Sequence, residues 1–315
     1  MIWLTWRQHR RQALFTLLGF VALAAFVVPT GLSMRHAYDR LSLAGCDGGT
    51  ACAAKLDEFT NTYGALVFVS VLMLTLPLVV GLFWGAPVVA REVEHGTHRM
   101  IWTQGISRRH WALSKTALLG GAVVVLAVVY GAGMSWWYAP LGRVDFRQNR
   151  FTQIFFDMQG IAPVGYTLFA VALGLFAGTV LPKVLPAMTA TLAGFVAVRV
   201  AVTVLARPHY MSPVSRTESI FKAPGSRDDL VGDWVLAKST HQADGTFVAS
   251  GTVRCPAPDN CAAVTDFGLR PGAYNALLVQ PADRFWAFQW IETGIFVALA
   301  ALLVWFAVRR IRRIA

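Results

Sequence analysis

The chain has 315 residues, of which 56% are hydrophobic and only 14% are charged. About a quarter of the residues in an ordinary soluble domain are charged, so this composition excludes that class and indicates a membrane protein. The formal net charge of +11 would point to nucleic acid in a soluble protein, but here the placement of the charges follows the rule for membrane orientation.

The first segment, residues 1–12, is predicted to form an N-terminal interfacial helix. Trp3 and Trp6 would share one face of such a helix, while its three arginines could reach lipid phosphates. A simple positively charged flank is the alternative. The apolar stretch that follows is too long for a signal peptide, so we expect an uncleaved first span.

Six apolar stretches predict six transmembrane helices, because about 20 apolar residues are needed to cross about 30 Å of hydrocarbon. The sequence therefore predicts an all-α polytopic membrane protein, with helices one to five in residues 13–205 and helix six with a basic tail in residues 285–315. The predicted spans are Ala13–Met34, Tyr63–Ala90, Thr116–Trp137, Val164–Leu181, Val184–Leu205 and Phe285–Val308.

The Lys and Arg residues predict that both termini are cytosolic. The cytosolic segments would then be residues 1–12, 91–115, 182–183 and 309–315, which hold 13 Lys and Arg but only two acids, Glu92 and Glu94. The opposite side would be neutral. Such an asymmetry is typical of a multi-pass protein, so we expect a cell-membrane location, lipid neighbours and no nucleic-acid partner.

Four cysteines fall on the predicted outer side, where disulfides persist. Cys46 and Cys52 lie in the first outer loop, and Cys255 and Cys261 lie in the last. Local Cys46–Cys52 and Cys255–Cys261 bridges are favoured among the three connectivities. A cysteine metal site is the alternative, but no histidine or second CxxC motif supports it.

The longer outer segments are not expected to form a large independent domain. Residues 206–284 are expected to form a small, disulfide-pinned extracytoplasmic cap, in which two short strands surround Asp244-Gly245. The polar and apolar alternation in Leu141–Gly160 favours a short helix on the outer surface.

Two full charges fall inside predicted spans. Arg199 and Glu292 each lie about seven residues from the outer end of their span, so antiparallel neighbours would hold them at one depth. An unpaired Arg in hydrocarbon costs about 2.5–3.5 kcal/mol on insertion scales, so we expect the two to pair. The pair is either a static clamp or a polar part of the substrate path or gate.

Two GxxxG motifs, Gly81–Gly85 and Gly174–Gly178, allow close helix approach. They serve either general packing or a dimer seam. The chain contains no GxxxxGK[ST] phosphate-binding loop. His95 and His98 lack the ligand spacing of a zinc site, so no metal site and no cofactor of its own are predicted.

Residues 91–115 form an unusually polar connector between spans two and three, with two acids and five bases. A short helix after Gly96 would lie along the membrane and expose a docking surface for a soluble partner. TWRQHR (Thr5–Arg10), this connector from Ala90 to Lys115, and QPADRFWAFQWIETG (Gln280–Gly294) resemble permease subunits of the ABC-2 family of ABC transporters, in the actinobacterial six-span type. The resemblance covers the membrane portion and matches the cap only loosely.

The resemblance implies a transmembrane permease subunit of an ABC exporter for amphipathic or hydrophobic molecules. It implies a permease homodimer with two ABC ATP-binding subunits, and it places ATP and magnesium in those partners, so the chain itself would not be an enzyme. The connector would be the coupling helix, and Pro182-Lys183 a second, weaker contact. The implied coupling residues are Glu92, Glu94, Gly96, Thr97 and Arg99.

A non-transporting membrane sensor or immunity protein, which binds a ligand through its extracytoplasmic cap, is the alternative function. It would need no stoichiometric ATPase. An intramembrane enzyme would need paired Asp, a Ser/Lys dyad or a His cluster within spans, and the sequence offers none.

Overall fold

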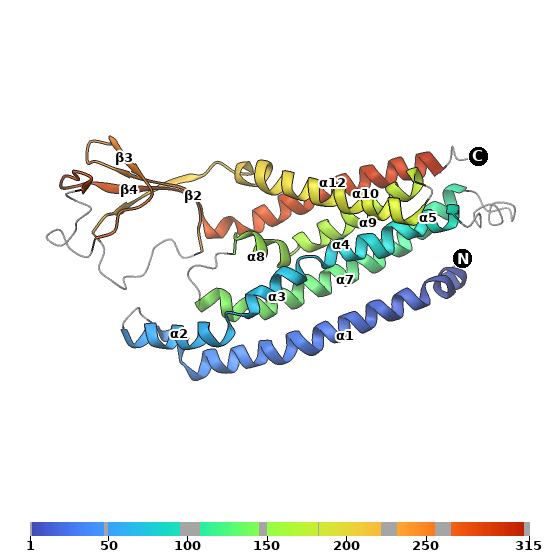
Figure 1. Cartoon of the computed structure of the whole chain (residues 1–315), viewed down its shortest axis with the longest axis horizontal. Coiled ribbons are helices and arrows are strands. Elements are labelled where there is room, and N and C mark those ends of the chain that lie inside the picture. The colour runs from blue at the N-terminus through green and yellow to red at the C-terminus, as the bar shows by residue number, and fades with distance from the viewer. Residues whose placement is uncertain are drawn as a thin grey trace.

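The computed structural model describes residues 2–46, 50–94, 108–144, 150–181, 183–221, 232–255 and 266–311. These residues form an elongated bundle of roughly parallel helices with a small β-sheet at one end (Figure 1). Helix α1 (Ile2–Arg40) begins, and helix α12 (Phe285–Ile311) ends, at the opposite end. We call the two ends the sheet end and the connector end, because residues 95–107 join two spans at the latter.

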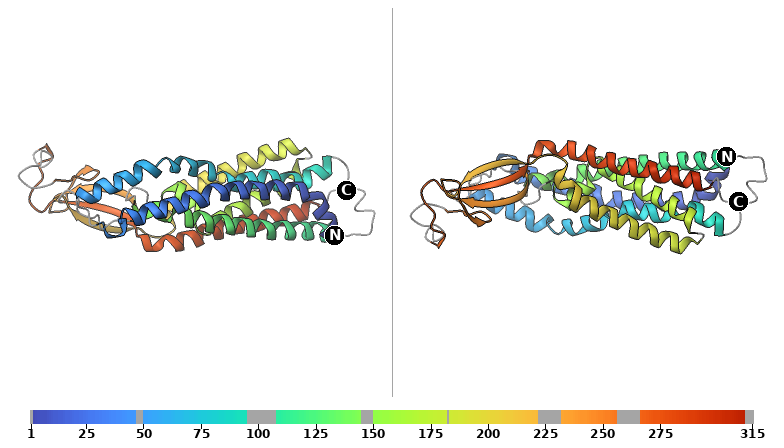
Figure 2. Two further views of the ribbon diagram at one scale, coloured as in Figure 1. Left: turned by 90° about the horizontal axis from the view of Figure 1, so that it is seen from below. Right: turned by 90° about the horizontal axis from the view of Figure 1, so that it is seen from above.

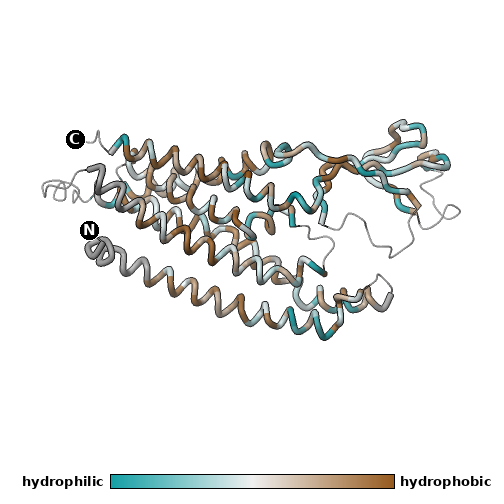
Figure 3. Tube along the Cα trace, turned by 180° about the vertical axis from the view of Figure 1, so that it is seen from behind, coloured by the Kyte–Doolittle hydropathy of each residue, from teal (hydrophilic) through white to brown (hydrophobic). Residues whose placement is uncertain are grey.

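Six helical segments of the described chain are long and apolar enough to cross a membrane. Each overlaps one predicted span, which confirms the six-helix prediction. Figure 3 shows hydrophobic residues along the bundle and hydrophilic ones gathered toward its ends and in the sheet. The segments are Leu14–Arg40, Phe68–Arg91, Ala117–Val144, Ala162–Val180, Val184–His209 and Ala282–Arg310.

Helix α1 runs without interruption through the predicted interfacial segment and the first span. Two indole N–H groups hold it against the bundle. Trp84 Nε1 donates to Thr16 Oγ1 at 3.0 Å, and Trp137 Nε1, on α7 (Arg108–Val144), donates to Thr30 Oγ1 at 2.9 Å. At the sheet end, η1 (Leu43–Gly45) and the Cys46–Cys52 disulfide lead into α2 (Thr50–Tyr63).

The second span is built from four short helical pieces, because prolines and glycines interrupt it. It comprises α3 (Leu66–Met73), α4 (Leu76–Val80), the π-helical turn η2 (Gly81–Gly85) and α5 (Ala86–Glu94). Pro77 stands in the first turn of α4, where a proline needs no hydrogen-bond partner.

The two GxxxG motifs pack against each other within the chain. Helix α9 (Ala162–Val180) is the most buried span and contacts the other helices of the bundle core. A Cβ on Gly174 would lie 2.6 Å from the backbone nitrogen of Ala86, and one on Gly85 would lie 2.6 Å from the carbonyl oxygen of Val171. The motifs therefore serve intramolecular packing, which leaves no room for a side chain.

The fifth span continues beyond its predicted end at Leu205. Helix α10 (Val184–Ala201) is followed by the π-helical turn η3 (Val202–Ala206) and the 3₁₀ turn η4 (Arg207–His209). Arg207, expected in the cap, thus belongs to the end of the fifth span.

The cap contains a four-stranded antiparallel sheet in the order β1-β4-β2-β3. Its strands are β1 (Val214–Ser219), β2 (Trp234–His241), β3 (Phe247–Ser250) and β4 (Tyr274–Gln280). Strands β2 and β3 form the predicted hairpin, and Gly245 in its turn has a φ of +87°, which glycine adopts most readily.

Short links join this sheet to spans five and six (Figure 2). Four residues separate His209 from β1, and four separate β4 from α12, three of them in η5 (Ala282–Arg284). The first link also bonds to β4 and to the second link: Gln280 Nε2 at the end of β4 donates to the Met211 carbonyl at 2.6 Å, and Arg284 Nη1 donates to the Ser212 carbonyl at 2.7 Å.

The structure contains the short helix expected in Leu141–Gly160, but the prediction that it lies on the outer surface is wrong. Helix α8 (Gln153–Met158) is buried along Phe155–Met158 and contacts α3, α7 and α9. The apolar side chains of this short helix have neighbours on several sides, and its one acid, Asp157, has basic partners inside the bundle. Burial of this helix is therefore favoured over a place on the surface.

Candidate functional site

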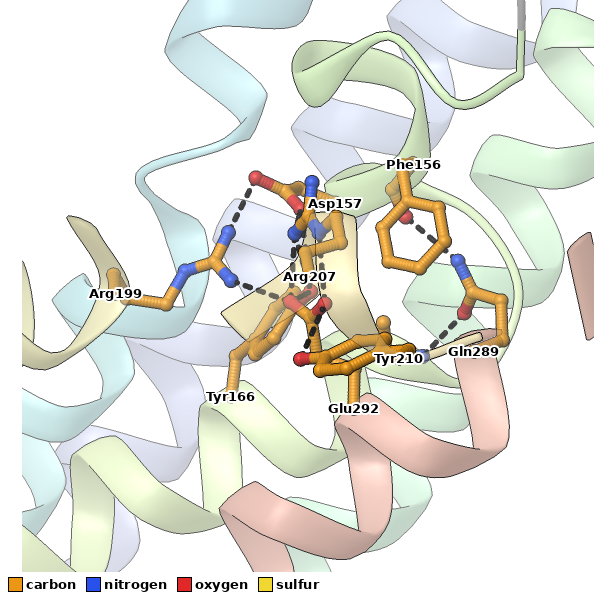
Figure 4. Close-up of polar contacts among 9 residues, drawn as sticks. Phe156, Asp157, Tyr166, Arg199, Arg207, Tyr210, Gln289 and Glu292 are labelled. Carbon is orange, nitrogen blue, oxygen red and sulfur yellow. Dashed lines mark hydrogen bonds and ion pairs between the residues drawn. The ribbon is translucent and has the colours of Figure 1, made fainter. Parts of the chain in front are cut away.

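A buried network of charged and hydroxyl side chains lies at the sheet end of the bundle (Figure 4). Helices α8, α9, α10 and α12 and the turn η4 supply it. We call it the charge network; its members are Asp157, Tyr166, Arg199, Arg207, Tyr210 and Glu292.

Arg207 and Glu292 form the centre of the charge network. Arg207 Nε donates to Glu292 Oε2 at 2.8 Å, and Arg207 Nη2 donates to Glu292 Oε1 at 2.6 Å. This two-point geometry uses the planar fork of the guanidinium. Arg207 Nη2 also lies 2.5 Å from Asp157 Oδ1, so one arginine joins α8 to α12.

The structure brings the predicted pair Arg199 and Glu292 together, with Arg199 Nη1 3.1 Å from Glu292 Oε1. Arg199 also forms an ion pair with Asp157, and its guanidinium carbon lies 3.7 Å from the centre of the Tyr166 ring. The Tyr166 hydroxyl is 2.6 Å from Glu292 Oε1, and that of Tyr210 is 3.2 Å from Oε2. The predicted pair is therefore one of several contacts in the charge network.

Burial of the charge network is nearly complete, and its formal charges cancel. The side chains of Arg207 and Glu292 expose 1% and 0% of their surface, and those of Asp157 and Arg199 expose 5% and 12%. Two arginines face two carboxylates, so removal of any one of these four charged side chains would leave a net charge inside the bundle. Such an uncompensated buried charge is strongly destabilising.

The π turn η3 explains how one helix can supply both arginines. Eight residues of regular α-helix would separate Arg199 and Arg207 by about 80° around the axis, because each turn takes 3.6 residues. The wider turn of η3 (Val202–Ala206) takes up an additional residue and returns Arg207 toward the face of Arg199.

Gln289, one turn before Glu292 on α12, fixes the junction between α8 and α9. Its Oε1 accepts from the backbone nitrogens of Ile161 and Ala162 at 3.1 and 2.8 Å, and its Nε2 donates to the Phe156 carbonyl at 2.8 Å. Gly160 at this junction has a φ of +65°, and a Cβ there would lie 2.8 Å from Gln289 Oε1. This junction positions both Asp157 and Tyr166.

An aromatic cluster adjoins the charge network on the side of the sheet. The Phe151 ring stacks on Trp234 of β2 at 5.8 Å and meets Phe288 of α12 edge-on at 5.3 Å. The Phe156 ring lies 4.3 Å from the guanidinium carbon of Arg207. These rings exclude water from one side of the ion pairs and therefore strengthen them.

The chemistry of this site favours holding helices together over catalysis. Both carboxylates are occupied by guanidinium groups, so neither is placed to act as a general base. Among the described residues, no group of three His, Cys, Asp or Glu side chains is arranged to bind a metal ion.

At the connector end, Glu94 makes a contact between spans. Its Oε2 accepts from the backbone nitrogen of Val184, the first residue of α10, at 3.0 Å. Nearby, Arg310 Nε on α12 donates to the Thr179 carbonyl in the last turn of α9 at 3.2 Å. A carboxylate at a helix N-terminus and a guanidinium at a helix C-terminus both match the helix dipoles.

Of the remaining predicted coupling residues, the structure describes only one. Glu92 belongs to α5, while Gly96, Thr97 and Arg99 lie outside the described residues, as does Pro182. Glu94 and the turn before α10 had been predicted separately, and the structure brings them together.

The predicted cysteine bridges are described in part. Cys46 and Cys52 form a disulfide with their Cα atoms 5.5 Å apart. Cys255 is also disulfide-bonded, and Cys261 lies outside the described residues.

The sequence interpretation missed Asp157, Tyr166 and Arg207. A signal existed for two of them: Asp157 is the single acid within an apolar run, FTQIFFDM, and Arg207 follows an apolar span by two residues. A charge so placed needs a partner, so a search for charged residues beside the predicted spans would have found both. Tyr166 carried no comparable signal.

A family model described as ABC-2 membrane transporter related matches residues 17–207. The matched region covers spans one to five and includes the connector and three of the four charged members of the charge network. No curated protein and no solved structure matches the chain significantly.

Proposed function

Since the chain belongs to the ABC-2 membrane transporter related family, we propose that it is the permease subunit of an ABC exporter whose ATP is hydrolysed by a separate subunit. The family and the six spans identify a multi-pass membrane protein of the permease type, which is not itself catalytic. Export and the ATP-driven partner are the proposed part.

The observation that carries this proposal is the common location of the basic segments. The start of α1, both ends of the connector and the end of α12 all lie at the connector end (Figure 1). These segments, residues 1–12, 91–115 and 309–315, hold 12 Lys and Arg and only two acids. The positive-inside rule supports a cytosolic connector end, where an ATP-binding subunit is available.

In this proposal the connector is the coupling element. Glu92 and Glu94 at the end of α5, with Gly96, Thr97 and Arg99, contact the partner. ATP and magnesium are bound by that partner, because the chain has no GxxxxGK[ST] motif. Two permease copies assemble with two ATPases in a cell membrane, and the cargo is amphipathic or hydrophobic, in keeping with the apolar faces of the spans.

The test is reconstitution with an ABC ATP-binding protein from the same organism, identified by its GxxxxGK[ST] motif. We expect the tagged permease to retain that protein at equal stoichiometry through purification in detergent. We also expect ATP to drive a fluorescent hydrophobic dye across proteoliposomes that contain the complex. A partner with its phosphate-loop Lys replaced by Ala is the control, and it should bind without driving transport.

The sensor alternative makes the opposite forecast. A permease that purifies without any ATP-binding protein, yet is stable and binds a ligand through residues 206–284, would overturn the exporter proposal.

A further inference from the structure

We propose that α10 transmits movement of the connector to the charge network, and that Glu94 is the positioning residue that joins the connector to α10. This inference rests on the proposed function, because it assumes that an ATPase moves the connector. It assigns a role to two sets of contacts at opposite ends of the same helix.

The connector-end contact links Glu94 directly to α10. Glu94, in the first part of the connector, is the last residue of α5, and its carboxylate accepts from Val184 N at 3.0 Å. Lys183, at the N-cap position of α10, makes no side-chain capping bond of its own. Glu94 thus supplies, from another span, the cap that a helix N-terminus normally takes from its own sequence.

Between its ends, α10 packs on α9 and α5 and leaves the rest of its surface outside the bundle core. In the apolar window of the fifth span 17% of residues are buried, against 72% in the window of α9. The buried residues of α10 form one narrow stripe of Ala187, Thr191 and Phe195. A helix held along a single stripe can shift or rotate at a lower cost than one packed on all sides.

The sheet-end contacts of the same span are strong. Arg199 and Arg207 both enter the charge network, where they pair with Asp157 of α8 and Glu292 of α12. Helix α10 has 18 residues, and at 1.5 Å per residue it is a rod of about 27 Å. A displacement of its N-terminus therefore reaches the arginines with little loss along the helix.

These three observations make α10 a mechanical link between the two ends. A pull on the connector moves Glu94, Glu94 moves the N-terminus of α10, and the arginines change their contacts with the carboxylates of the other helices. The π turn η3 before Arg207 is a natural place for the helix to adjust, because such turns accept changes of register.

A labelling experiment on the complete complex tests this link. Met211 is half-buried and follows Tyr210 of the charge network, so a Met211→Cys variant reports on the packing there. The complex of permease and ATPase is placed in lipid nanodiscs. The rate of modification by a polar maleimide is then compared without nucleotide and with ATP and vanadate, and labelling of the native cysteines is subtracted.

The decisive comparison is between Glu94→Ala and Arg310→Ala, both in the Met211→Cys background. Each removes one charged cap at the connector end, but of the two only Glu94 bonds to α10, against which α5 also packs. In the parent and in Arg310→Ala we expect the nucleotide to change the labelling rate about fivefold or more, which is the low end of typical coupling between sites. In Glu94→Ala the change should disappear, and Glu94→Gln, which keeps an acceptor, should recover part of it.

The outcomes separate this inference from the proposed function. If ATPase binding and hydrolysis persist and the nucleotide response is unchanged in Glu94→Ala, or is lost equally in Arg310→Ala, the role of α10 is refuted and the exporter stands. If no ATPase joins the parent complex, the exporter proposal itself fails.

Discussion

Replacement of Arg207 by Leu should destabilise the protein more than any other single change in the charge network. Arg207 is the most fully bonded of the basic members, with two bonds to Glu292 and one to Asp157. Without it, two carboxylates share Arg199 alone and one negative charge stays uncompensated. We expect a loss of about 3–5 kcal/mol in the free energy of unfolding, as for other broken buried ion pairs.

The double variant Arg207→Leu with Glu292→Leu should cost much less than the sum of its parts. It leaves Arg199 paired with Asp157, so the network keeps its charge balance. The remaining loss comes mainly from the Tyr210 hydroxyl, which loses its acceptor at about 1–2 kcal/mol, whereas the Tyr166 hydroxyl keeps Asp157 Oδ1 at 3.2 Å. We therefore expect an interaction energy of about 3 kcal/mol between the two substitutions.

The free energies are measured by unfolding the purified permease with sodium dodecyl sulfate in mixed micelles, followed by circular dichroism. The pair Arg40 and Glu58 is the control, because its side chains are 71% and 56% exposed and lie 3.4 Å apart. The same cycle at that pair should give about 0.5 kcal/mol or less. Additive losses at Arg207 and Glu292, or a single loss no larger than that of Arg40→Leu, would refute the description of a balanced buried network.

Two further predictions concern other parts of the fold. Gly174→Ala should lower the free energy of unfolding by about 1–3 kcal/mol through overpacking, because its Cβ would meet backbone atoms of the second span at 2.6–2.9 Å. Gly121→Ala is the control: a Cβ there has nothing within 4 Å, so this variant should be nearly neutral in the same unfolding assay. Equal losses for the two glycines would contradict the packing argument. In the hairpin, the backbone N–H and hydroxyl of Thr246 donate to Asp244 Oδ1 at 2.9 and 2.7 Å, which lowers the pKa of the Asp244 carboxyl. The stability that these bonds give the hairpin is therefore present above the unfolded-state pKa of Asp244 and is lost as pH falls through its native pKa. In Thr246→Val, an NMR titration with labelled carboxyl groups should show a higher pKa for Asp244. An unchanged pKa would exclude the hydroxyl as a cause.

Most of the helical architecture was predictable because hydrocarbon imposes a single solution on a long apolar stretch. Six spans, the hairpin around Gly245 and the Cys46–Cys52 bridge all rest on local patterns, which operate within a few residues. The pairing of Arg199 with Glu292 also followed, since equal depth in antiparallel helices is a simple count along two spans.

The contacts of the other members of the charge network depend on tertiary structure, which local sequence patterns do not reveal. Asp157 enters the bundle because α8 turns inward, and that turn is fixed by Gln289, which lies more than a hundred residues further along the chain. Arg207 lies on the same side as Arg199 only because η3 is a π turn. The apolar sequence of Val202–Ala206 does not distinguish such a turn from an ordinary α-helix. The contact of Glu94 with α10 likewise needs the relative placement of two spans.

The sheet has a consequence for where a molecule could leave the membrane. Strand β1 continues the fifth span, β4 runs into the sixth, and the two strands are hydrogen-bonded neighbours from Val214–Val279 to Ser219–Tyr274. Paired strands lie about 4.8 Å apart, so the sheet holds spans five and six together at the sheet end. If the protein is an exporter, a substrate that leaves at this end must pass between other helices. A cysteine cross-link between the segments that join the sheet to spans five and six should therefore leave transport fully active.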